Sequence, residues 1–141
     1  MQLTDTHAHL YLDAFKEDRD AMMSRAREAG VKRFFLPAID AAHSELMKQF
    51  REEYPEEVYL MAGLHPTHVA EDHLKELEFV ERQLEEGGYV AVGEIGIDLY
   101  WDTSRLQEQI RAFEEQIRLA RKFDLPIVIH CREAFDEIFN V

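Results

Sequence analysis

The sequence predicts a parallel α/β fold, and two observations support this class. Short apolar runs alternate along the whole chain with segments of helical period, which is typical of repeated strand–helix units. Histidine and acidic side chains also recur where the apolar runs end. Ligands of parallel α/β folds bind at the carboxyl ends of the strands, so these side chains are expected to converge on one pocket.

Five apolar runs are the predicted strands. Each is rich in Val, Ile, Leu, Phe or Ala without strict polar alternation, as expected of strands that are covered on both faces. They span residues 2–5, 31–39, 58–64, 89–95 and 126–130.

Four segments between these runs carry apolar residues at helical spacing. The predicted helical faces lie within residues 15–29, 42–50, 74–84 and 106–120. Ser104 and Gln107 form a candidate capping box for the last of them. A fifth helix begins with Ala134, Ile138 and Val141 and has no stop signal.

The domain organisation follows from these counts. We expect residues 1–141 to form a single domain without linker or repeat. Five strands are too few to close an eight-stranded barrel, which typically needs about 250 residues. The chain is therefore expected to be the N-terminal part of a longer fold whose C-terminal strands are absent.

Composition limits the function classes. The formal net charge of −13 argues against a broad basic nucleic-acid-binding face, although a divalent metal can reverse the potential inside one pocket. No apolar stretch reaches the roughly 20 residues that span a bilayer, and the N-terminus lacks a signal pattern. With the lone Cys131, expected to be a buried, inert thiol, this predicts a cytoplasmic protein.

Four residues are the predicted metal ligands. His7 and His9 are two apart, so an extended strand would present both on one face, and two imidazoles with a carboxylate suit Zn, Mn, Fe or Ni. Glu94 lies within an apolar run, where a carboxylate is costly unless it is paired or metal-bound, and the alternative is a salt bridge to an arginine. His130 ends another run, and its alternative is a buried histidine with one backbone hydrogen bond.

Other polar residues near the strand ends have weaker roles. His65 could contact a substrate phosphate, transfer a proton or serve as a structural turn residue. Arg132 could hold a phosphate or pair with a nearby acid. Asp98 and Trp101 are expected to form a pocket wall. The remaining histidines, His43, His68 and His73, are interpreted as surface residues.

Four segments in this order resemble the TatD family of metal-dependent deoxyribonucleases. They are residues 4–10 (TDTHAHL), 63–66 (GLHP), 92–98 (VGEIGID) and 125–134 (LPIVIHCREA). The resemblance extends from residue 2 to the last residue, and one departure is Thr67, where many relatives carry a second histidine.

The resemblance implies a TIM-type (β/α)8 barrel, here incomplete with about five βα units, and two divalent cations (Mg, Mn or Zn). His7 and His9 match the ligands of one metal, Glu94 the bridging carboxylate, and His130 a ligand of the second. A further histidine and the aspartate expected to act as acid or base come from later strands, beyond Val141.

The leading hypothesis is a metal-dependent hydrolase of phosphodiester bonds that acts on DNA or on a small phosphodiester through a metal-activated water. One alternative is an amidohydrolase that cleaves C–N or C–O bonds, although many of those enzymes place a carboxylated lysine where this chain has Glu94. The other is a non-catalytic fragment of such a hydrolase.

Overall fold

The computed structural model describes residues 1–141 and contains five strands, each followed by a helix. The strands are β1 (Leu3–Asp5), β2 (Val31–Leu36), β3 (Val58–Ala62), β4 (Tyr89–Asp98) and β5 (Ile127–Arg132). The helices are α1 (Arg19–Glu28), α2 (Ser44–Glu53), α3 (His73–Glu86), α4 (Leu106–Phe123) and α5 (Phe135–Phe139). Three 3-10 turns lie before helices: η1 (Asp13–Phe15), η2 (Ala41–His43) and η3 (Pro66–His68).

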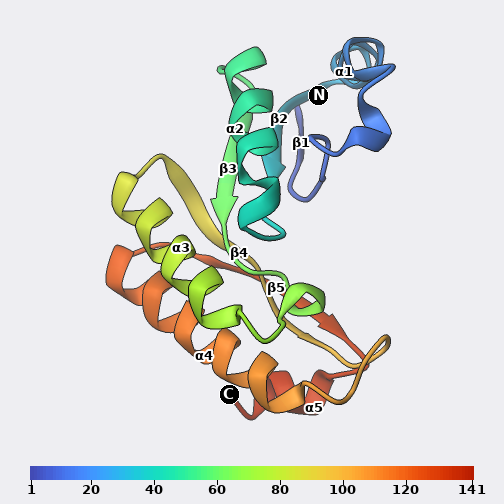
Figure 1. Cartoon of the computed structure of the whole chain (residues 1–141). Helices are drawn as coiled ribbons and strands as arrows, with labels where there is room; N and C mark the ends of the chain where they lie inside the picture. The colour runs from blue at the N-terminus through green and yellow to red at the C-terminus, as the bar shows by residue number, and fades with distance from the viewer.

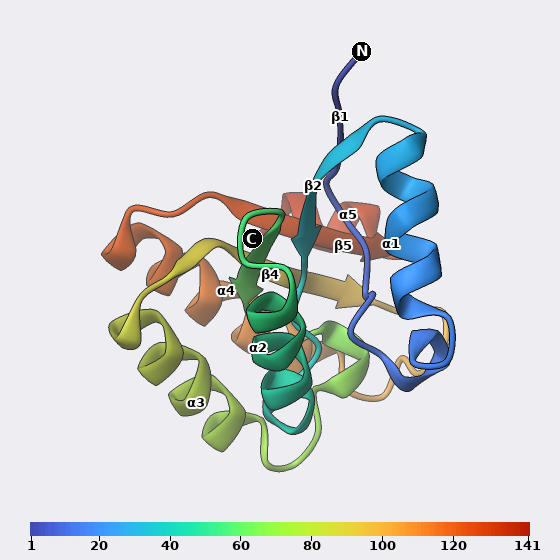
Figure 2. The ribbon, with the colours of Figure 1, turned by 90° about the horizontal axis from the view of Figure 1, so that it is seen from above.

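The strands form one parallel sheet in the order β1-β2-β3-β4-β5, so neighbours in sequence are neighbours in space. Crossovers between parallel strands are right-handed, and each new strand is added on the same side of the last. The helices therefore follow one another around the curled sheet, with α1, α2 and α3 in sequence in Figure 2. This is the winding of a TIM-type barrel rather than of a doubly wound sheet.

Two apolar clusters hold the helices on the sheet. One joins α1 and α2 to β2 and β3 through buried side chains such as Met23, Phe34 and Phe50. The other joins α3 and α4 to β3 and β4, and includes Leu77, Ile95 and Phe113 in its centre. Helices α3 and α4 lie side by side in Figure 1 and contact each other.

The five predicted strands and the helices between them are confirmed, and the differences are at their ends. The first strand stops at Asp5, so His7 and His9 lie in the loop after it rather than on it. The fourth continues to Asp98, which places Glu94 inside the strand. The predicted capping box is wrong, because the residue before α4 is Arg105 and no side chain caps this helix.

The outward face of β5 differs from the expectation. Ile127 and Ile129 are 36% and 45% exposed, and Cys131, which was predicted to be buried, is exposed as well. Alternate residues of a strand share a face, so these three lie opposite to His130. This face of β5 is open to solvent.

None of the helices combines the length and the apolar character that crossing a lipid bilayer requires.

Candidate metal centre

Glu94 of β4 is the centre of a cluster of four histidines. Its side chain is 8% exposed, and its Oε2 atom lies 2.9 Å from Nε2 of His7, 3.5 Å from Nε2 of His9 and 3.6 Å from Nε2 of His65. Its Oε1 atom lies 2.8 Å from Nδ1 of His130. One carboxylate therefore meets four imidazoles from three segments of the chain, and its two oxygens face different groups.

Tyr11 fixes the tautomer of His9. The buried Tyr11 hydroxyl donates its hydrogen to the carbonyl of Pro37 at 2.8 Å, so at 2.9 Å from Nδ1 of His9 it can only accept. His9 therefore carries its hydrogen on Nδ1, and the lone pair of Nε2 points to Glu94. Nε2 of His9 and Oε2 of Glu94 are then two acceptors 3.5 Å apart, and a positive charge between them, a metal ion or a proton, removes their repulsion.

His130 of β5 lies between two carboxylates. Nδ1 faces Oε1 of Glu94 and Nε2 lies 2.8 Å from Oδ2 of Asp98, which is 2% exposed. Carboxylates accept hydrogen bonds, so both ring nitrogens donate in this arrangement. The hydrogen bond with Glu94 raises the pKa of His130, burial opposes it, and the bond with Asp98 adds to the rise.

His65 has the opposite tautomer to His9. The backbone N–H of Thr67 donates to Nδ1 of His65 at 3.2 Å, and the Thr67 hydroxyl lies 2.7 Å from the same atom. Nδ1 is thus the acceptor, and Nε2–H points to Glu94. Burial lowers the pKa of His65 to about 4 in spite of the nearby Glu94 charge, so this ring is neutral at pH 7 and acts as a donor.

The histidines keep Glu94 ionised. Burial alone would raise the pKa of Glu94, but the surrounding histidines, first of all the hydrogen bond from His130, outweigh it and hold the pKa well below its usual range. A buried carboxylate that stays charged is a strong attractor for cations.

Two glutamines of α4 fix the strand ends that carry the cluster. Gln116 accepts from the backbone N–H of Leu64 at 2.6 Å and donates to its carbonyl at 3.2 Å, which anchors the residue before His65. Gln109 makes the same pair of bonds to the backbone of Asp98, at 2.8 and 3.1 Å. The two are seven residues apart, two helical turns, so one face of α4 holds both strand ends.

Gly96 lets β4 and β5 approach beside the cluster. A Cβ atom at this position would lie 2.0 Å from the carbonyl oxygen of His130, and the φ of +142° disfavours any side chain. A larger residue would push His130 away from Glu94.

The donor set suits a divalent cation. Ligand atoms of His7, His9 and Glu94 lie within 4.8 Å of one another, and so do those of His65, Glu94 and His130. Imidazole nitrogen and carboxylate oxygen are ligands of Zn, Mn and Fe in proteins. The two groups share Glu94, one oxygen of which faces His7 while the other faces His130.

The structure brings together all four residues that were predicted as metal ligands, together with His65. Arg132 does not join them: its guanidinium carbon lies 3.6 Å from the centre of the Tyr100 ring. Asp98 was expected in a pocket wall, and it does line a hollow with Trp101, but it also holds His130.

Sequence reasoning missed Tyr11, Gln109 and Gln116, which position the cluster. Tyr11 could have been noticed because it continues the spacing of two residues that relates His7 to His9. The glutamines fall on the apolar face of a helix, and that is an unusual place for a polar side chain.

Two of the histidines interpreted as surface residues form a cluster of their own. Nδ1 of His43 and Nδ1 of His68 lie 2.6 and 2.7 Å from the two oxygens of Asp40. Burial would raise the pKa of Asp40, and these hydrogen bonds lower it instead. The rings of His68 and His65 are 6.3 Å apart, so the Asp40 cluster borders the Glu94 cluster.

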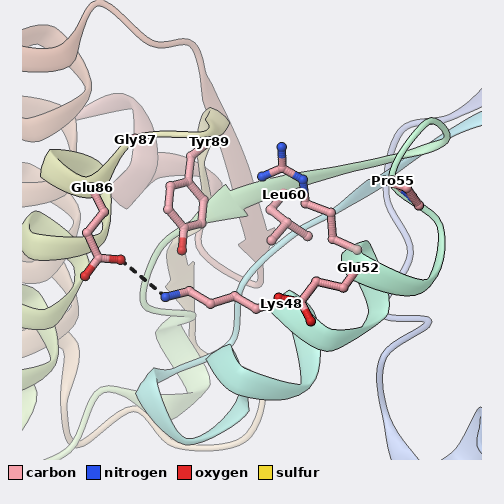
Figure 3. A pocket seen from close by; sticks show the side chains of 8 residues that line it. Lys48, Glu52, Pro55, Leu60, Glu86, Gly87 and Tyr89 are labelled. Atoms are coloured by element: carbon pink, nitrogen blue, oxygen red, sulfur yellow. Dashed lines mark hydrogen bonds and ion pairs between the residues drawn. The ribbon is translucent and has the colours of Figure 1, made fainter.

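A separate pocket lies between α2 and the start of β4. It has a volume of about 330 Å3 and is lined by residues that include Lys48, Leu60, Glu86 and Tyr89. Figure 3 shows the Lys48 ammonium directed to the Glu86 carboxylate across it, at 3.3 Å. None of the residues around Glu94 lines this pocket.

The sequence model of a family described as TatD related DNase matches residues 4–141. The chain belongs to this family. Two curated TatD-family relatives are similar over nearly its whole length. The chain is 35% identical to the uncharacterized metal-dependent hydrolase YjjV of Escherichia coli over 136 residues, 95% of this chain and 52% of that protein. It is 32% identical to the 3'-5' ssDNA/RNA exonuclease TatD of Erwinia tasmaniensis over 137 residues, 97% of this chain and 53% of that protein.

The fold agrees with the TatD family. The crystal structure of the E. coli TatD homologue YjjV superposes with a TM-score of 0.88 at 34% identity, over 96% of this chain and 53% of that one. The predicted TIM-type fold is confirmed by this likeness, and the chain spans about half the length of the relatives it matches.

Proposed function

We propose that the protein is a metal-dependent hydrolase of phosphodiester bonds, a TatD-type deoxyribonuclease. One observation carries the proposal: the two oxygens of the buried Glu94 face histidines on opposite sides, His7 and His9 at Oε2 and His130 at Oε1. A carboxylate in this position can bridge two cations, and paired cations are typical of enzymes that hydrolyse phosphate esters.

Two divalent cations, Mg, Mn or Zn, are the proposed cofactors. His7, His9 and one oxygen of Glu94 would hold one, and His130 with the other oxygen would hold the second. Such cations supply Lewis-acid stabilisation of the phosphate and activation of water at neutral pH. The lone pair of His9 that faces Glu94 at 3.5 Å supports the first site, because a cation removes the repulsion between two acceptors.

His65 and Arg132 are the proposed contacts to the substrate phosphate. The Nε2–H of neutral His65 points into the cluster and can donate to a phosphate oxygen. Arg132 follows His130 by two residues on β5, so both side chains emerge on the same face of the strand. With a formal net charge of −13, the protein would attract phosphate only at such a site.

The relatives support this reaction class. One is named a 3'-5' ssDNA/RNA exonuclease and another a metal-dependent hydrolase, and each is about twice as long as this chain. We propose that residues 1–141 form a single domain that corresponds to the N-terminal part of such a barrel. The exposed apolar face of β5, with Ile127 and Ile129, supports a barrel that continues beyond this strand.

The test is a hydrolysis assay of the Mn-loaded protein with bis-p-nitrophenyl phosphate, a labelled DNA oligonucleotide and a panel of cyclic amides. The proposal expects turnover of the phosphodiesters, and loss of turnover both with EDTA and in Glu94→Ala. Lys48→Ala, in the separate pocket of Figure 3, is the matched control and should keep the wild-type rate. Turnover of the amides alone would indicate an amidohydrolase, and metal binding without turnover of any substrate would contradict catalysis.

A further inference from the structure

Two aromatic side chains stand exposed just after β4. Trp101 is 72% exposed and Tyr100 is 52% exposed, and their rings meet edge to face at 4.8 Å. The Arg132 guanidinium carbon lies 3.6 Å from the centre of the Tyr100 ring and 5.4 Å from that of Trp101. Large exposed aromatics with a cation over their faces form a rigid platform at little cost in conformational entropy.

The platform is tied to the metal centre through Asp98. One oxygen of this buried carboxylate accepts from the backbone N–H of Tyr100 at 3.0 Å, and the other accepts from His130 at 2.8 Å. Trp101 also lines a small hollow together with Asp98 and Thr67, the residue that orients His65. The aromatic segment is therefore linked to His130 through Asp98, and Trp101 shares a hollow with the residue that orients His65.

We propose that Trp101 and Tyr100, with Arg132, form a subsite that stacks an unpaired nucleobase of a single-stranded nucleic acid. The assignment rests on the proposed phosphodiesterase function, since it places the base next to the phosphate that the Glu94 cluster would bind. Aromatic rings and guanidinium planes stack on bases, and a cation beside the ring can contact the neighbouring phosphate.

The exposed rings distinguish a single strand from a duplex. In a duplex both faces of each base are covered by its neighbours, so a ring has access to a base face only where the strand is unpaired. Stacking also tolerates any base, because every base has a π face. The subsite thus gives preference for single strands with little sequence specificity.

Trp101 reports on this subsite directly, because it is the only tryptophan of the chain. The intrinsic fluorescence of the full chain is titrated with a 12-nucleotide single-stranded DNA in EDTA, where hydrolysis is prevented. An abasic strand of equal length and a blunt duplex are the comparison probes. We expect saturable quenching by the base-bearing single strand and weak quenching by the other two. Equal responses to the base-bearing and abasic strands would overturn the subsite.

Substitutions then separate stacking from the reaction itself. Binding by these variants is measured through the fluorescence anisotropy of an end-labelled strand, since they lack the tryptophan. Loss of the stacked ring in Trp101→Leu should weaken binding of the base-bearing strand by roughly 5- to 150-fold, and Trp101→Phe should restore most of it. Phe139→Leu, at a side chain that is 73% exposed on α5, is the matched control and should bind like the wild type.

Failure of the subsite can be told from failure of the proposed function. If the wild type hydrolyses DNA and Trp101→Leu keeps the full preference for base-bearing over abasic strands, the subsite is wrong and the hydrolase stands. If the wild type hydrolyses no phosphodiester and the base-bearing strand still quenches Trp101 selectively, the function is wrong and the subsite is supported.

Discussion

The Nε2 atom of His130 lies 2.8 Å from Oδ2 of Asp98, and this buried carboxylate ends the strand that carries Glu94. The bond holds the ring so that Nδ1 is directed at Oε1 of Glu94. Histidines that bind metals commonly donate their second nitrogen to such a carboxylate, which fixes the tautomer and the ring orientation.

Replacement of Asp98 by asparagine should weaken cation binding at His130. Loss of an orienting partner of this kind typically lowers metal affinity by about 10- to 100-fold, and the pKa of His130 should also fall because one of the two carboxylates is lost. Isothermal titration with Mn measures the affinity, and NMR of the His130 ring measures the pKa. Asp136→Asn on α5 is the control, and equal affinities in the two variants would disprove the positioning role.

Tyr11→Phe should reduce both stability and metal affinity. The variant leaves the Pro37 carbonyl and Nδ1 of His9 without their partner inside the protein. An unsatisfied buried group costs about 1–3 kcal/mol of unfolding free energy, which urea denaturation can measure. Tyr59→Phe, at a partly exposed ring that stacks on Phe35, is the matched control. A Tyr11→Phe variant with wild-type stability and wild-type metal affinity would show that the hydroxyl does not position His9.

Much of this arrangement follows from patterns visible in the chain. The apolar runs predict the strands, and the placement of His7, His9, Glu94 and His130 near their ends predicts the cluster, because parallel strands end at a common edge. The exact strand ends were not predictable: pairing of β4 with β5 extends β4 to Asp98, and no local pattern encodes a partner 36 residues away from Glu94.

The positioning residues were missed for a related reason. A tyrosine hydroxyl or a glutamine amide acts through a partner that is distant in sequence, as Gln116 does through Leu64, 52 residues earlier. Cys131 was assigned to the interior because apolar strands are usually covered on both faces, and the outward face of β5 is open instead.

Gln116→Met should destabilise the fold and disturb His65. The change leaves both backbone groups of Leu64 unsatisfied in a buried environment, which costs about 1–3 kcal/mol for each group. Thermal unfolding measures the loss. Gln49→Met, an exposed glutamine on α2 that bonds only to Glu45, should unfold like the wild type. If both variants melt together with the wild type, Gln116 does not anchor the strand end.

Cation binding should weaken as the pH falls. The pKa of His130 is raised above its ordinary 6.5 by Glu94 and Asp98, so the proton on this ring stabilises the cluster below that raised pKa and is lost as the pH rises through it. A cation competes with the proton, and its affinity therefore decreases as the pH drops through the same range. His65, with a pKa of about 4, contributes no proton above pH 6.

Calorimetry in buffers of different ionisation enthalpy measures how many protons the protein releases when it binds the cation. We expect a net release on cation binding near pH 6.5 that disappears at high pH. A release that stays constant from pH 6 to pH 9 would contradict the assignment to His130.

Anomalous diffraction from crystals soaked in Mn shows whether Glu94 bridges two cations. We expect two anomalous peaks about 3.5–4 Å apart. One should lie between Oε2 of Glu94 and the rings of His7 and His9, the other between Oε1 and His130, and both should be absent in Glu94→Gln. Peaks placed away from Glu94, or unchanged peaks in the variant, would contradict the bridging role.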